Sequence, residues 1–371
     1  YAEMSCRGFR DGGLVATGKH FPGRGASAGD AHFEIPVVNV DKDTLLHREL
    51  LPYQVLFEKG LLPAVMVAHS VFPAIDGDDV ATVSKKVVTG LLREKLQFDG
   101  VICTDSMTMG GIALRYGVSG ACVRALEAGA DLVLLKAENG LVGETFHAVK
   151  HAAETGEIGE KDLDEKVGRV LSLKYEYGMF YPDPENTESP ETVIRNRGIV
   201  ELSRLTAKKS VLVARDRKKL LPLTRSGKIL VIEQIGKTPN DLFWHPALLY
   251  ENCARYNGNA DYLETTFTYD PEDRQNILDA VKDYDTIVIT SYYLRGRRSN
   301  VEFISRLLQD KTKNYVVVTN TPYRISIPDG ADTVVLTFAT SPRNIESTAG
   351  TLFGEIRPEG EWPLQYRLPL E

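Results

Sequence analysis

The stretch Gly100-Val101-Ile102-Cys103-Thr104-Asp105 decides the fold, because an apolar run ends abruptly in a carboxylate. A short, nearly continuous apolar run is typical of a parallel strand that is covered by helices. Similar runs predict three further strands, at residues 14–17, 64–68 and 131–135. Amphipathic segments predict helices at residues 44–59, 84–96, 118–128, 142–153 and 160–177. Repeated strand–helix units therefore predict a parallel α/β sheet or barrel within residues 1–180.

A second α/β domain is predicted at residues 192–371. Residues 181–191, with three prolines and no apolar periodicity, predict a linker before it. The domain is expected to be a doubly wound α/β sandwich. Neither a Gly-x-Gly-x-x-Gly motif nor a Walker loop follows its strands, so a nucleotide site is not expected. Its predicted strands are 210–213, 229–232, 286–290, 315–319 and 333–337, and its predicted helices are 192–205, 271–282 and 301–309.

The composition is that of an ordinary globular protein, with 43% hydrophobic and 26% charged residues. The net charge of −7 argues against nucleic acid or an anionic membrane as a partner. No apolar run approaches the roughly 18 residues that a membrane span needs. The four cysteines show no CxxC spacing, and the histidines and carboxylates do not cluster at ligand spacing. We therefore expect no metal and no other cofactor.

Candidate site residues are found where the four predicted strands of the first domain end, since reacting groups in parallel α/β folds lie at the carboxyl ends of strands. A single polar residue at such an end often only caps the following helix, but four consecutive polar ends favour a site. These residues are Lys19 with His20, then His69, Asp105 and Lys136.

The loop after the first predicted strand, residues 19–32, holds a second candidate group. Asp30 and His32 are two residues apart, so in extended backbone their side chains point to the same side. A carboxylate beside an imidazole fixes its tautomer and stabilises its protonated form, which makes an acid/base pair for neutral pH. A solvated loop is the competing interpretation of this short motif.

Five segments carry a resemblance to a known family. Lys19-His20-Phe21-Pro22-Gly23-Arg24-Gly25 with Asp30-Ala31-His32 resembles the loop signature of the β-N-acetylglucosaminidase branch of glycoside hydrolase family 3. Residues 101–107 resemble that family's nucleophile strand, and residues 81–93 also read like the family. Residues 320–323 and 352–360 are similar to the second domain of its two-domain members.

The resemblance implies a retaining double displacement at a β-linked N-acetylglucosamine (GlcNAc). Asp105 would be the nucleophile, His32 the acid/base residue and Asp30 its partner in a dyad. Lys19 and His20 would hydrogen-bond sugar hydroxyls. Arg24 stands where many relatives carry histidine, and no role follows for it, for His69 or for Lys136.

The resemblance also places residues 1–180 on strands 5 to 8 of a (β/α)₈ barrel, which needs about 250 residues in all. The first half of the barrel is therefore expected to be absent from this chain, or present as a separate piece. The isolated 371-residue chain is expected to be weakly active or inactive. Full hydrolysis of a chromogenic N-acetylglucosaminide by this chain would contradict that expectation.

Three alternatives to the N-acetylglucosaminidase stay open. A phosphorylase would use phosphate in place of water, since a neutral imidazole repels an anionic acceptor less than a carboxylate does. A catalytically incompetent fragment would keep the sugar pocket as a binding module. A β-glucosidase of the same family is disfavoured by the Asp-x-His loop. The expected partner is a GlcNAc-containing oligosaccharide or muropeptide. No signal peptide can be judged from a chain that starts at Tyr1, so the sequence leaves the location open, with a lean toward the cytoplasm.

Overall fold

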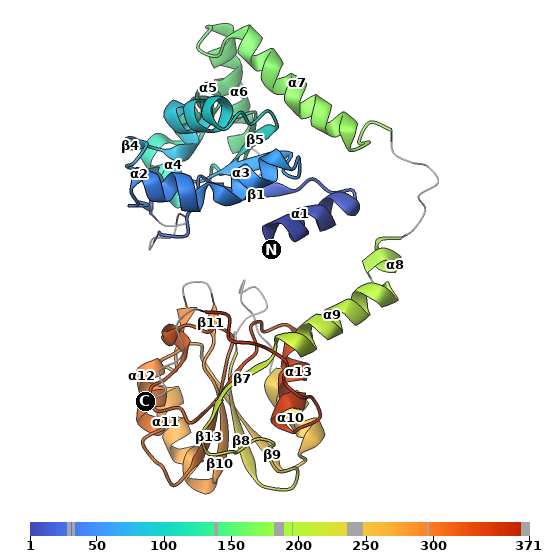
Figure 1. The fold of residues 1–371 in the computed structure, drawn as a ribbon. Coiled ribbons are helices and arrows are strands. Elements are labelled where there is room, and N and C mark those ends of the chain that lie inside the picture. Colours follow the sequence, from blue (N-terminus) through green and yellow to red (C-terminus); the bar gives the residue numbers. More distant parts are fainter. Residues whose placement is uncertain are drawn as a thin grey trace. The chain divides into compact units, whose positions relative to one another are not determined.

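The computed structural model describes residues 1–27, 31, 34–136, 140–181, 189–194, 196–235, 248–294 and 297–364. The chain forms two compact units, Tyr1–Asn186 and Thr187–Glu371 (Figure 1). Each unit has its own sheet and its own hydrophobic core, and each is described here by itself.

The first unit is built on a four-stranded sheet in the order β1-β2-β5-β6, in which all neighbours are parallel. A separate antiparallel hairpin, β3-β4, follows β2. The strands are β1 (Thr17–Phe21), β2 (Ala64–Val67), β3 (Val71–Phe72), β4 (Asp76–Val80), β5 (Val101–Ser106) and β6 (Leu132–Leu134). The main helices are α1 (Ala2–Asp11), α2 (Lys42–Thr44), α3 (Leu51–Glu58), η3 (Lys86–Lys95), α4 (Gly110–Tyr116), α5 (Val118–Ala128), α6 (Gly140–Glu154) and α7 (Glu160–Glu176).

The two faces of this sheet differ. Val65, Val67 and Ile102 point into the core that the helices cover. Lys19, Met66, Cys103 and Leu132 pair in one row across the four strands and do not belong to that core. Asp105 lies two residues beyond Cys103, where the pairing of β5 with β6 is irregular, at the carboxyl end of the sheet.

The position of the first strand corrects the sequence prediction. The apolar residues 14–17 were expected to form it, but Leu14 is exposed and its N–H donates to the Phe9 carbonyl at the end of α1. The strand β1 runs instead from Thr17 to Phe21, because Thr17, Gly18 and Lys19 pair with β2. Lys19 and His20 therefore lie within the strand and not after it.

Asp131 joins three elements at the amino end of the sheet. Its fully buried carboxylate accepts hydrogen bonds from Arg93 on η3, from Arg169 on α7 and from the Ile102 N–H on β5. Few other side chains of α7 are buried, so this cluster is a main attachment of the helix.

Asp131→Asn is expected to lower the free energy of unfolding by about 3–5 kcal/mol, because it leaves two partly buried arginines without their charge partner. Thermal unfolding checks this. In the control, Asp79→Asn, the more exposed pair with Arg124 is lost, and about 0–1 kcal/mol is expected. Equal losses in the two variants would contradict the account.

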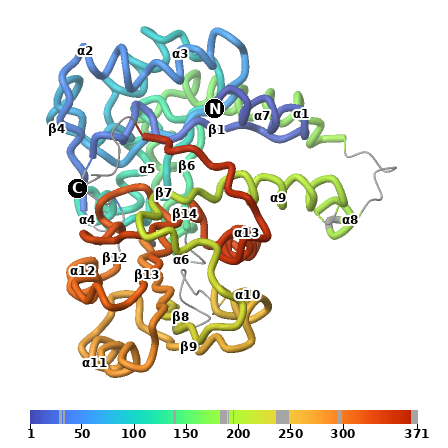
Figure 2. Tube along the Cα trace, turned by 60° about the horizontal axis from the view of Figure 1, so that its bottom comes forward, coloured from blue at the N-terminus to red at the C-terminus, as the bar shows by residue number. Residues whose placement is uncertain are grey.

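The second unit is a six-stranded sheet in the order β7-β14-β13-β10-β8-β9, parallel except for β7. Figures 1 and 2 show helices on both of its faces. α10 and α13 cover the side chains of Val231, Val288 and Val335, and α11 and α12 cover those of Ile232, Ile289 and Val334. The elements are α8 (Pro190–Ile194), α9 (Arg197–Ser210), β7 (Leu212–Asp216), β8 (Ile229–Gln234), α10 (Leu248–Tyr256), β9 (Ala260–Thr265), α11 (Pro271–Ala280), β10 (Thr286–Thr290), β11 (Tyr293–Leu294), β12 (Arg297–Arg298), α12 (Val301–Leu307), β13 (Asn314–Thr319), β14 (Thr333–Leu336) and α13 (Pro342–Leu352).

Three features of this unit escaped the sequence analysis. The edge strand β9 carries two exposed charged residues, Asp261 and Glu264, so no apolar run marks it. The helices α10 and α13 were also missed. The predicted helix at 192–205 is instead the pair α8 and α9. Most of the predicted linker, at 182–188, lies outside the described residues.

Glu233 at the end of β8 occupies the place where a doubly wound fold usually binds phosphate. The strand order reverses beside β8, because β9 lies on one side of it and β10 on the other. The two carboxylate oxygens of Glu233 accept hydrogen bonds from the Leu249 and Tyr250 N–H groups in the first turn of α10. Burial raises the pKa of Glu233 to about 7, although both N–H groups act to lower it. The helix N-terminus is thus occupied by the protein's own side chain.

Candidate functional site

Asp105 and His20 form the centre of the candidate site. Asp105 lies near the carboxyl end of β5, and His20 lies on β1, two strands away in the sheet order. His20 Nε2 is 3.2 Å from Asp105 Oδ2, and the Ser106 N–H donates to Asp105 Oδ1 over 2.7 Å. Both side chains remain about one-fifth to one-quarter exposed, at 21% and 24%. A carboxylate held on both oxygens yet open to solvent is oriented toward an external reactant.

The charge state of Asp105 follows from these contacts. Burial acts to raise the pKa of its carboxyl, but the hydrogen bond from His20 and the Ser106 N–H outweigh burial. The pKa is therefore held well below its usual value, and the group is ionised at neutral pH. A carboxylate of this kind serves as a nucleophile or as a partner for developing positive charge, and it does not serve as an acid.

The other predicted site residues divide into three groups. Lys19 lies on β1 in the same row as Met66 and Cys103, with its side chain exposed. Arg24 lies in the loop after β1 and is half-buried. Asp30 and His32 lie outside the described residues, so their dyad stays a prediction.

His69 is a part of the site to which the sequence assigned no role. It follows β2 and is 1% exposed, with Nδ1 2.8 Å from Thr82 Oγ1 and Nε2 3.1 Å from the Ser106 carbonyl oxygen. Its position at a strand end was a usable signal, but nothing in the sequence indicated that it contacts the strand of Asp105. Lys136 contacts the same segment through its backbone, since its N–H donates to Ser106 Oγ over 3.2 Å.

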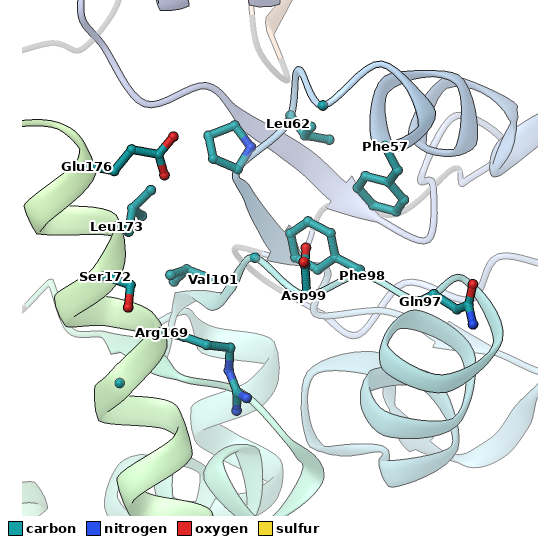
Figure 3. A pocket seen from close by; sticks show the side chains of 14 residues that line it. Phe57, Leu62, Gln97, Phe98, Asp99, Val101, Arg169, Ser172, Leu173 and Glu176 are labelled. Carbon is teal, nitrogen blue, oxygen red and sulfur yellow. The ribbon is translucent and has the colours of Figure 1, made fainter.

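The cavity shown in Figure 3 lies at the opposite end of the sheet from Asp105. It encloses about 560 Å³ between α7 and the amino ends of β2 and β5, and Val101 lines it. Val101 and Asp105 are four residues apart on an extended strand, which separates them by about 13 Å. In parallel α/β folds this end of the sheet serves stability, so the cavity is not the reaction site.

Within the described parts of the chain, no group of three or more histidine, cysteine, aspartate or glutamate side chains is placed to hold a metal ion. Over the same residues, no helix is both long enough and apolar enough to span a membrane.

The sequence of the first unit also matches a known protein family. Residues 1–173 match the family described as the glycosyl hydrolase family 3 N-terminal domain. The match covers almost the whole of the first unit, Tyr1–Asn186, so that unit is similar to the N-terminal domain of glycoside hydrolase family 3.

Individual relatives are named for hexosaminidases. A "Beta-hexosaminidase" of Glaesserella parasuis serovar 5 is 38% identical over 134 residues, which cover 36% of this chain and 39% of the relative. A "Beta-hexosaminidase A" of Pseudoalteromonas piscicida is 28% identical over 185 residues, covering 45% of this chain and 31% of the relative. The chain thus spans about two fifths of the length of the first of these relatives.

A solved structure is similar over both units. It is a glycoside hydrolase family 3 β-N-acetylglucosaminidase from Paenibacillus sp. str. FPU-7, at 28% identity and a TM-score of 0.87. The match covers 96% of this chain and 68% of that one. The predicted fold class, part of a barrel followed by an α/β sandwich, is confirmed by this match and by the two parallel sheets.

Proposed function

We propose that this chain carries the nucleophile of a retaining β-N-acetylglucosaminidase that removes terminal β-linked GlcNAc from an oligosaccharide or muropeptide. The observation that carries the proposal is the ionised Asp105, held on both oxygens at the carboxyl end of β5. The names of the hexosaminidase relatives and of the structural neighbour support GlcNAc as the sugar that is removed.

In the first step, an oxygen of Asp105 attacks the anomeric carbon while the bond to the leaving oxygen breaks. His32 gives its proton to that oxygen, and a covalent glycosyl-enzyme remains. His20 keeps the carboxylate ionised and oriented until the attack, and Lys19 offers a charged donor to a sugar hydroxyl.

In the second step, water attacks the anomeric carbon, and Asp105 leaves as a carboxylate. His32 accepts the proton of the water, and Asp30 stabilises the imidazolium that results. Two displacements on one carbon return the β configuration, so the sugar is released with retention.

The test is hydrolysis of 4-nitrophenyl N-acetyl-β-glucosaminide by the natural protein that carries this chain, followed by proton NMR of the first product formed. We expect β-GlcNAc as the first anomer and little release from the matching β-glucoside. Formation of GlcNAc 1-phosphate in phosphate buffer would contradict hydrolysis and indicate a phosphorylase. Binding of GlcNAc without turnover would contradict an enzymatic role and indicate a sugar-binding module.

A further inference from the structure

His69 connects two parts of the site, the end of β2 and the turn that follows Asp105. The side chain is buried, and both ring nitrogens have partners. Its Nε2 lies 3.1 Å from the Ser106 carbonyl oxygen, and its Nδ1 lies 2.8 Å from Thr82 Oγ1. The charged groups that act on it are Asp105, His20 and Arg24.

The chemistry of these partners assigns the tautomer. A carbonyl oxygen only accepts, so the contact with Ser106 requires a hydrogen on Nε2. Burial lowers the pKa of His69, which favours the neutral ring, and Nδ1 must then accept. The Thr82 hydroxyl is the donor that Nδ1 needs. Thr82 also contacts the Ala68 carbonyl at 2.9 Å, and one hydroxyl hydrogen serves only one of these acceptors at a time.

Ser106 transmits this arrangement to Asp105. The Ser106 N–H donates to Asp105 Oδ1, while the Ser106 carbonyl accepts from His69 Nε2 and from the Met109 N–H. Ser106 is therefore held on both sides, and only its own φ and ψ angles separate the peptide unit that carries the N–H from the one that carries the carbonyl. A catalytic group is effective only when such supporting contacts hold it in place.

We propose that His69 is a positioning residue for Asp105, acting through the Ser106 backbone in the tautomer that the Ser106 carbonyl requires. The assignment of a reaction to Asp105 rests on the proposed function, but the contact between His69 and Ser106 does not. The side chain of His69 is buried, so it acts on the nucleophile through the Ser106 backbone.

The experiment compares His69→Leu with His69→Gln, in which the amide nitrogen replaces Nε2 as a donor. In the 371-residue chain, the Asp105 carboxyl is titrated by carbon-13 NMR and assigned with Asp105→Asn. Leucine is expected to raise the pKa of Asp105, since the Ser106 N–H is no longer held on its carboxylate. Glutamine is expected to keep the pKa low. If glutamine behaves as leucine does, the effect comes from the charge of the ring, and the proposal is overturned.

The tautomer is tested separately by nitrogen-15 NMR of the histidine rings. We expect the neutral Nε2–H form of His69 in the wild type and also in Thr82→Val, because the Ser106 carbonyl accepts only a hydrogen on Nε2. A wild-type ring protonated on Nδ1 alone would overturn the proposal.

In the natural protein that carries this chain, His69→Leu is expected to lower kcat about 30-fold with KM nearly unchanged, and His69→Gln is expected to restore most of it. If the wild type is active and His69→Leu has the same kcat, the positioning role of His69 is overturned, but the proposed function is not. An inactive wild type would contradict the proposed function, and the two NMR experiments would still decide on His69.

Discussion

Asp105→Asn is expected to lower kcat by roughly 10⁴-fold or more, with the fold and sugar binding retained. The amide has nearly the shape of the carboxylate but lacks its negative charge, so it does not attack the anomeric carbon. Steady-state kinetics together with a binding titration of GlcNAc checks this. Asp99→Asn is the control, because Asp99 is exposed and lies two residues before the start of β5; less than about a three-fold change is expected there.

A second variant distinguishes between two roles of Asp105, that of the nucleophile and that of a carboxylate that only orients the substrate. In Asp105→Gly, azide has room to attack the anomeric carbon from the side on which Asp105 stood. Recovery of activity with formation of the α-glycosyl azide supports the nucleophile. Recovery with the β-azide would contradict it, because attack would then come from the opposite face.

His20→Leu is expected to reduce kcat/KM roughly 100-fold and to move the acid limb of its pH profile upward. The hydrogen bond from His20 is the foremost contact that lowers the pKa of Asp105 against the effect of burial. Without it the carboxylate protonates at a higher pH, and activity is lost earlier on acidification. The pH profile of kcat/KM between about pH 3 and 8 measures the shift.

His20→Leu is also expected to change how the free energy of unfolding depends on pH. Because the folded pKa of Asp105 is lowered, the stabilisation is present above the unfolded value near 3.8 and is lost as pH falls through the folded value. The difference in unfolding free energy between wild type and His20→Leu should therefore be largest near neutral pH and shrink in strong acid. His47→Gln is the control, since its contact with Asp43 is exposed. An unchanged acid limb in His20→Leu would contradict the account.

Much of the first unit was predictable, because β2, β5 and β6 are apolar on one or both faces and each begins within one residue of the predicted position. The strand β1 was misplaced because its second face is polar, with Thr17 and Lys19 exposed. A search for apolar runs therefore selected residues 14–17, most of which belong to the connection between α1 and β1, in place of the strand itself. In the second unit, β9 was missed for a related reason, since an edge strand needs only one apolar face.

Prediction from the sequence was limited in the same way at the candidate site. Asp105 was a candidate because polar residues end all four predicted strands of the first domain, and the family resemblance implied its role as the nucleophile. The contact of His20 with Asp105 was not identifiable, since it depends on β1 and β5 lying on either side of β2. The bonds from His69 to Thr82 and Ser106 join residues 13 and 37 positions apart, and no local pattern encodes them.

The most direct test of the central claim is the mass of the natural protein that carries this chain, after incubation with a slow 5-fluoro GlcNAc donor. Trypsin releases residues 96–115 as one peptide, which contains both Asp99 and Asp105, so fragmentation must locate the sugar within it. The account predicts one fluorinated GlcNAc per chain, bound to Asp105. A label on any other carboxylate, or turnover with no label at all, would contradict the assignment of the nucleophile.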